Sequence, residues 1–160
     1  MEIKHCILSF ATLSLLYSLN GFAELPADYQ STVKHTEASD TATMNIRIIV
    51  NGQILSATLD DNPTTRDFVS LLPLTVELED YAGTEKIVYL SRKLTTEDAP
   101  PGVDPDLGDI TYYAPWGNLA LFYKDFGYAK GLIRLGHIEG DMSLFKTVDA
   151  MSVRIEISKD

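Results

Sequence analysis

The sequence predicts a mainly β domain, a closed antiparallel barrel of about eight strands with two short helices. Three observations favour this fold class. Short segments alternate apolar and polar residues with a period of two, turn-forming residues separate them, and only two segments show helical spacing, without internal repeats. The chain has 160 residues, of which 45% are apolar and 22% charged. This composition is ordinary for a single globular domain.

The chain begins with a segment typical of a secretory signal peptide. Lys4 precedes an apolar run over residues 6–19, and Gly21-Phe22-Ala23 places small residues where signal peptidase reads them. We therefore expect cleavage after Ala23, removal of residues 1–23, and a periplasmic or secreted product. The run is too short to predict stable membrane insertion after cleavage. The single Cys, Cys6, lies in the removed segment, so no disulfides are expected.

The next segment, residues 24–43, is predicted to be a flexible leader. It consists mainly of Ser, Thr, Ala, Asp and Glu, with hardly a large apolar residue. Such a segment cannot bury enough apolar surface to offset the entropy lost on ordering. The folded domain is therefore predicted to occupy residues 44–158.

The predicted domain opens with a β-hairpin and a helix. Two alternating strands, Met44–Val50 and Gln53–Leu59, flank Asn51-Gly52, which is a strong signal for a two-residue hairpin turn. Asn62-Pro63 then supplies an N-cap and a first-turn proline. Apolar residues recur at helical spacing after it, which predicts a helix through Leu72.

The middle of the domain is predicted to contain a second strand pair and a long loop. Leu74–Tyr81 alternates cleanly, Ala82-Gly83 forms a turn, and residues 86–90 are apolar and β-branched enough for a short strand. Residues 94–107 form a loop rich in Pro and Asp. Irregular segments of this length inside compact domains tend to be functional or mobile.

An aromatic-rich stretch, residues 108–123, is predicted to form two strands around a Pro115-Trp116-Gly117-Asn118 corner. The alternation of strand side chains divides its rings between the two faces of the sheet. We expect two thirds of the aromatic side chains here to pack inside, with Trp116 partly exposed at the corner. The set consists of Tyr112, Tyr113, Trp116, Tyr123, Phe126 and Tyr128.

The last part of the chain is predicted to add two strands and a helix. A glycine-punctuated turn over residues 126–131 precedes the strand Leu132–Ile138. Asp141 is placed to cap a short helix over residues 141–148, and residues 151–158 alternate as the final strand.

Three spaced blocks within this order of elements resemble the bacterial cyclophilin-like domain family. The blocks are Gly108-Asp109-Ile110, Pro115-Trp116-Gly117-Asn118-Leu119-Ala120 and Leu132-Ile133-Arg134-Leu135-Gly136. The resemblance extends from Met44 to about Ser158. It implies an eight-stranded barrel of the cyclophilin type, with two helices covering its open ends.

The resemblance also raises the question of catalysis. True cyclophilins are peptidyl-prolyl isomerases in which an Arg stabilises the twisted peptide bond, between walls of Phe, Met, Gln, Trp and His. The Phe-rich strand with that Arg, and the Gln-Gly-Gly-Asp that follows it, are not found in this sequence. Arg92, in Tyr89-Leu90-Ser91-Arg92, is the only candidate for the catalytic Arg, and its surroundings do not match the active isomerases.

The resulting hypothesis is a binding domain that holds a peptide or small ligand without efficient isomerase activity. The candidate ligand-binding residues are Tyr113, Trp116, His137 and Arg92. Two alternatives stay open at this point. One is an active prolyl isomerase that uses Arg92, and the other is a structural domain that contacts an envelope protein.

The sequence favours neither a metal nor a cofactor. His137 is the only His of the predicted domain, and no Gly-x-Ser-x-Gly motif accompanies it, so a zinc site or a Ser-His-acid triad is not indicated. Asp104, Asp106 and Asp109 lack the spacing of a calcium-binding EF-hand, and the glycines do not form a phosphate-binding loop. The net charge of −10 is unfavourable for binding nucleic acid.

Overall fold

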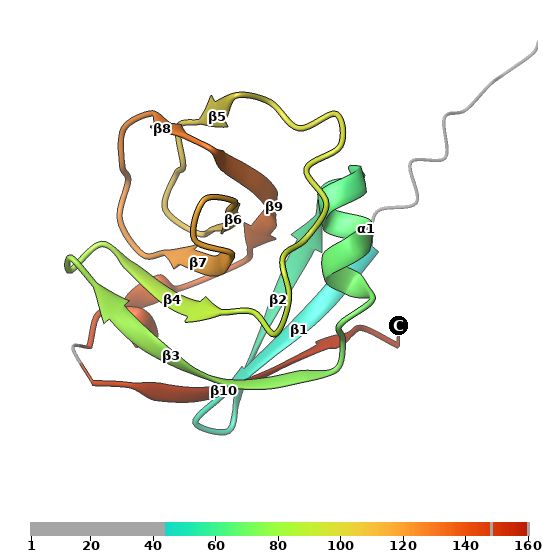
Figure 1. Ribbon diagram of the computed structural model, residues 1–160. Helices are drawn as coiled ribbons and strands as arrows, with labels where there is room; N and C mark the ends of the chain where they lie inside the picture. Colours follow the sequence, from blue (N-terminus) through green and yellow to red (C-terminus); the bar gives the residue numbers. More distant parts are fainter. Residues whose placement is uncertain (1–43, 148, 160) are drawn as a thin grey trace, which may run out of the picture. The chain divides into compact units, whose positions relative to one another are not determined.

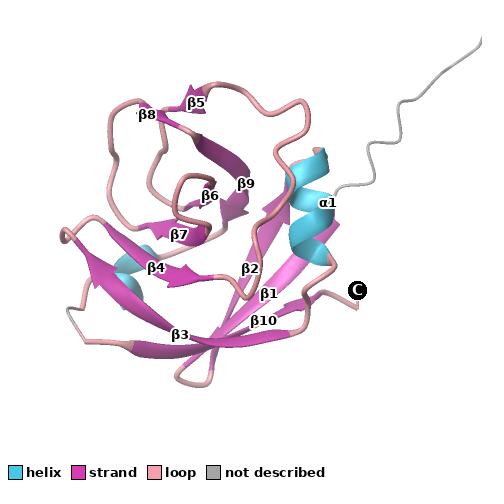
Figure 2. Cartoon of the chain, viewed as in Figure 1, coloured by secondary structure: helices cyan, strands magenta, loops and turns pink. Residues whose placement is uncertain are grey.

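A computed structural model describes residues 44–147 and 149–159, which form a closed antiparallel β-barrel (Figures 1 and 2). Its strands follow one another around the barrel in the order β1-β10-β3-β4-β7-β6-β9-β2. The predicted fold class is confirmed. The predicted signal peptide and leader lie outside the described residues. The barrel strands are β1 Met44–Val50, β2 Gln53–Leu59, β3 Leu74–Tyr81, β4 Glu85–Tyr89, β6 Asp109–Tyr113, β7 Asn118–Phe122, β9 Leu132–Ile138 and β10 Met151–Ile157.

A separate two-stranded ribbon pairs β5, Gly102–Val103, with β8, Ala129–Lys130. Neither strand was expected, because both lie in segments read as a loop and a turn. Two residues are too few to show an alternating pattern, and the ribbon exists only because the long loop folds back over the barrel beside β9 (Figure 1).

The two helices are shorter than the sequence pattern predicts. Helix α1 spans Pro63–Val69, and the Asn62 side chain accepts a hydrogen bond from the Thr65 backbone N–H at 2.8 Å. Beyond Val69 the chain continues in tighter turns with i→i+3 backbone bonds. The second helix is a single 3₁₀ turn, η1, over Met142–Phe145, capped as expected by Asp141.

The barrel interior is filled by the inward-facing residues of the alternating strands together with side chains from both helices. Phe68 from α1 and Phe145 from η1 are fully buried. The phenol of Tyr112 is also inside, where its hydroxyl accepts a hydrogen bond from the Leu94 backbone N–H at 3.0 Å. This bond ties the start of the long loop to the barrel core.

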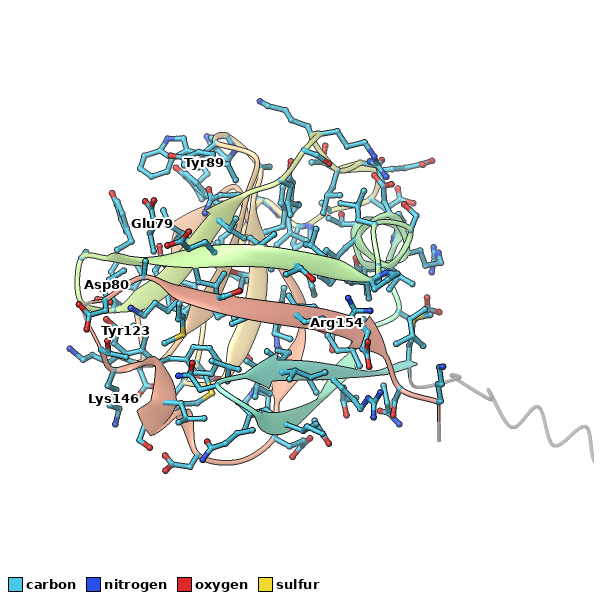
Figure 3. All side chains as sticks on the ribbon, turned by 90° about the horizontal axis from the view of Figure 1, so that it is seen from below. Glu79, Asp80, Tyr89, Tyr123, Lys146 and Arg154 are labelled. Atoms are coloured by element: carbon cyan, nitrogen blue, oxygen red, sulfur yellow. The ribbon has the colours of Figure 1, made fainter. Side chains whose placement is uncertain are left out.

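One buried cation closes the end of the barrel near η1. The Lys86 ammonium has no solvent exposure, lies 3.3 Å from a carboxylate oxygen of Asp80, and donates to the carbonyls of Thr147 and Asp149. The Tyr123 hydroxyl donates to the same Asp80 carboxylate (Figure 3), and burial raises the pKa of Tyr123 to about 12. The buried charge is therefore fully paired.

No helix within residues 44–147 and 149–159 combines the length and the hydrophobicity that a membrane span requires.

Candidate binding groove

The described domain carries a groove of about 410 Å³. Ligand sites in proteins are concave, largely apolar and of roughly this volume or larger. Residues of the β3–β4 hairpin, strands β6 and β7 with their connecting corner, and β8 contribute to it. Its lining consists of Tyr81, Ala82, Thr84, Glu85, Tyr113, Trp116, Asn118, Phe122, Phe126, Ala129, Lys130 and Leu132.

The groove exists because part of the barrel wall is apolar on both faces. All five residues of β7 are buried, with Leu119 and Leu121 in the main core. Ala120 and Phe122 belong instead to a second cluster with Ile87 and Leu132, against which Val103, Tyr113 and Ala129 pack. Val103 and Ala129 of the β5–β8 ribbon pack against part of this second cluster, and Phe122 and Leu132 of the cluster line the groove.

Three aromatic rings form one wall of the groove. The indole of Trp116 meets Tyr81 edge to face, with ring centroids 5.6 Å apart and planes at 87°. It meets Tyr113 similarly, at 5.4 Å and 78°. Gly117, with φ of 77°, lets the chain turn directly after the indole, and its N–H bonds the Tyr113 carbonyl at 2.8 Å. The corner therefore presents a fixed ring rather than a loose side chain.

The aromatic side chains of this region are less buried than the sequence analysis predicted. Tyr112 and Tyr123 are inside, but Phe126 and Tyr128 are more than half exposed and Trp116 is 46% exposed. The expectation that two thirds pack inside is wrong, because Trp116 and Phe126 border the groove rather than the barrel core and Tyr128 is exposed on the surface. The partial exposure predicted for Trp116 is confirmed.

Glu85 is the acidic residue of the groove. Strand pairing places it directly between Tyr81 on β3 and Phe122 on β7. Burial raises the pKa of its carboxyl from 4.5 to about 7, and no cation or hydrogen-bond donor of the described residues offsets this rise. Close to neutral pH the carboxyl therefore exchanges readily between its neutral and charged forms.

Asn118 supplies a second polar group with unused bonding capacity. Its side chain is 2% exposed and lies between Tyr89 and Tyr113 in the strand register. The amide nitrogen has a long contact of 3.4 Å to the Leu119 carbonyl, whereas the amide oxygen has no partner among the described residues. Buried acceptors without a donor are rare in folded proteins, and here the residue lines a groove that a ligand could enter.

Lys130 is the single cationic residue of the groove lining. It is exposed and comes from β8, across the groove from the β3–β4 hairpin. Its ammonium forms no ion pair with Glu85 within the described part of the chain. The groove thus combines apolar walls with a carboxyl and an amide oxygen that have no partner among residues 44–147 and 149–159.

Arg92 does not line this groove. Its guanidinium donates to both carboxylate oxygens of Asp67 on α1 and to the Ser70 hydroxyl, and 44% of its side chain is exposed. The Arg92 guanidinium, together with the Thr95 N–H, lowers the pKa of Asp67 to about 2. The residue fastens the segment before the long loop to helix α1.

His137 does not line the groove either. Its Nδ1 lies 3.0 Å from a carboxylate oxygen of Asp109, to which the Arg134 Nε also donates at 3.1 Å. The other Asp109 oxygen accepts from the Asp106 N–H, and Asp109 is 2% exposed. Of the four residues expected to share a groove, the structure brings together Tyr113 and Trp116.

Five residues that carry the chemistry of the groove were not predicted from the sequence. They are Tyr81, Glu85, Asn118, Phe126 and Lys130. One signal was available for Glu85, because it stands two residues before the apolar Ile87 and alternation therefore places both on the same face. The others come from separate elements, and only the closed barrel brings them together.

Among the described residues no cluster of three or more His, Cys, Asp or Glu side chains could hold a metal ion. Asp109, one of the acids weighed as a calcium ligand, is instead bound to Arg134 and His137 within the protein.

Comparison with known proteins gives one match at the level of the family. The sequence model of the Cyclophilin-like family matches residues 48–158. Among solved structures, the solution structure of a hypothetical protein from Archaeoglobus fulgidus is similar, with a TM-score of 0.53 and 22% sequence identity. The match covers 72% of this chain and 95% of the archaeal one, and it shows a shared fold. A search of the curated proteins finds no match.

Proposed function

Because the chain belongs to the cyclophilin-like family, we propose that it is an exported binding domain that holds a short peptide segment or a small ligand in the aromatic groove. The observation that carries this proposal is the groove itself. A cavity of about 410 Å³ with aromatic walls and two unpartnered polar groups matches the usual make-up of a ligand site. A purely structural domain has no need of such a hollow.

Efficient prolyl isomerisation is not part of the proposal. Catalysis by a cyclophilin-type groove needs a fixed cation near the nitrogen of the twisted amide bond. No Arg lines the groove, and the guanidinium of Arg92 is held by Asp67 outside it. Lys130 does line the groove, but its exposed side chain has no partner in the described chain that would hold its ammonium in place.

Fluorescence of the single Trp provides a direct test of binding. Trp116 lies at the groove wall, so a bound ligand should change its emission. We expect proline-containing peptides or members of a broad small-molecule panel to shift or quench this emission in a saturable manner. Tyr113→Ala should weaken the response at least about tenfold by removing one aromatic wall.

Ile54→Ala provides the control for this titration, because Ile54 is also exposed and apolar but does not line the groove. Its titration should match that of the parent protein. The proposal would be contradicted by emission that no compound changes, or by Tyr113→Ala binding as tightly as the parent. A protease-coupled isomerase assay completes the test. Substantial turnover that Arg92→Ala abolishes would replace the binding role with catalysis.

The proposal that the protein is exported rests on residues 1–23, which have the sequence pattern of a signal peptide. Cell fractionation and N-terminal sequencing of the purified protein test it. We expect a periplasmic or secreted product that begins at Glu24. A cytoplasmic product that retains Met1 would be evidence against it.

A further inference from the structure

Two acceptor groups of the groove lining have no partner among the described residues, and they bear on the kind of ligand that fits. Strand pairing places Glu85 between Tyr81 and Phe122, and its carboxyl has no cation or hydrogen-bond donor among the described residues. The Asn118 amide oxygen is fully buried and also lacks a donor. An N–H donor on a ligand would satisfy the Glu85 carboxylate. Asn118 lies four residues before Phe122, the partner of Glu85 on β7, so a single ammonium group does not reach both side chains.

The aromatic walls favour the same class of ligand. Tyr81 and Tyr113 each meet Trp116 nearly at right angles, so the three rings present faces and edges in different directions around one corner. The negative faces of aromatic rings attract cations, most strongly for Trp, and rings grouped in this way next to a carboxylate are suited to an organic ammonium group. The apolar side of the groove, with Phe122, Phe126 and Leu132, would contact the body of such a ligand.

From these contacts we propose that the groove selects organic cations, namely a protonated amine carried on an aromatic or aliphatic body, with the ammonium group bound by Glu85 and the Trp116 corner. This inference rests on the proposed binding function and narrows it to one ligand class. The net charge of −10 acts in the same direction, because it raises the local concentration of cations around the protein.

Lys130 is the group in the lining that opposes this selection. Its charge would repel an ammonium group and could attract a carboxylate instead. It is exposed, however, so solvent screens its charge, whereas Glu85 is partly buried and interacts through a medium of lower polarity. Replacing Lys130 should therefore strengthen binding of the cation modestly.

Binding of a cation should also be coupled to proton release. Without a ligand, burial holds the pKa of Glu85 near 7, so the carboxyl is largely neutral in mildly acidic solution. An ammonium group stabilises the charged form, so affinity should rise from about pH 5 to about pH 8. The titratable groups around Glu85 are Tyr81, Tyr113, Tyr123 and Lys130.

Three small probes of similar size and different charge test the selection with the full-length protein. They are 2-phenylethylammonium, the neutral 2-phenylethanol and the anionic phenylacetate, each titrated against Trp116 fluorescence. At about pH 8 we expect the cation to bind at least about tenfold more tightly than the alcohol, and the anion more weakly than either.

Glu85→Gln should remove most of the preference for the cation over the alcohol, together with the dependence of cation binding on pH. Glu77→Gln is the matched control, because it removes the same charge from an exposed site on β3 outside the groove. It should retain the preference. Circular dichroism of both variants confirms that they fold.

Each other outcome is decisive. Equal affinity for the cation and the alcohol would overturn the ligand class but leave the proposed binding function intact. Tighter binding of phenylacetate, lost in Lys130→Gln, would assign the groove to anions instead. Saturable binding by none of the probes, nor by the peptide and small-molecule panel, would overturn both proposals.

Discussion

Replacing Glu85 with Gln should make the protein more stable, and the gain should depend on pH. The Glu85 pKa is about 7 in the folded protein, against an ordinary value of 4.5. Below about pH 4 the carboxyl is neutral in both the folded and the unfolded states, so burial costs little. As the pH rises toward 7, the unfolded state loses its proton first, and the folded state is destabilised relative to it.

The magnitude follows from the difference between the two pKa values. One pKa unit corresponds to about 1.4 kcal/mol, so a rise from 4.5 to about 7 costs at most about 3 kcal/mol once the pH exceeds 7. Gln has nearly the same shape but never ionises. The stability difference between Glu85→Gln and the parent should therefore grow by up to about 3 kcal/mol between about pH 4 and about pH 8.

Urea unfolding at a series of pH values measures this difference. The other titratable groups are common to both proteins and cancel in the comparison. Glu77→Gln, at an exposed position of β3, should show a difference from the parent that is nearly independent of pH. Parallel stability curves for Glu85→Gln and the parent would refute the reasoning, because they would mean that Glu85 is as well solvated in the folded state as in the unfolded one.

Two further substitutions test the barrel that supports the groove, both by urea unfolding. Lys86→Met should destabilise the protein by about 3 kcal/mol, because it leaves the Asp80 carboxylate without its buried cation. An unchanged urea midpoint would show that this ion pair makes no net contribution to stability. Gly136→Ala should lower the stability by about 2 kcal/mol or more, because the added Cβ would lie 2.3 Å from the Thr58 carbonyl oxygen on β2. A variant as stable as the parent would mean that β2 and β9 separate easily at this point.

Local patterns in the sequence were sufficient for most of the barrel. The alternation in Leu74–Tyr81 and the Asn51-Gly52 turn depend on neighbouring residues, and the structure has a strand and a hairpin there. The Asn62 and Asp141 caps are equally local and are present as expected. The ends of both helices were less well predicted, because the tighter turns that follow α1 depend on packing as well as on residue type.

The bonding partners of the candidate site residues could not be predicted from local sequence patterns. Arg92 is held by Asp67, which precedes it by 25 positions, and His137 is held by Asp109, 28 positions earlier. Nothing in the residues next to Arg92 or His137 indicates these partners. Only Tyr113 and Trp116, which are three positions apart in one hairpin, were placed together correctly.

Strand periodicity, turn residues and caps act over a few positions, so the amino-acid sequence was enough to indicate a mainly β barrel with two short helices and an exposed Trp at its corner. Closure of the barrel determined which residues form the groove. It placed Glu85 between Tyr81 and Phe122, buried the Asn118 amide oxygen without a donor from the described residues, and packed the β5–β8 ribbon against a second apolar cluster. These contacts join strands that are distant along the chain, and therefore the groove and its preference for a cation are properties of the tertiary structure.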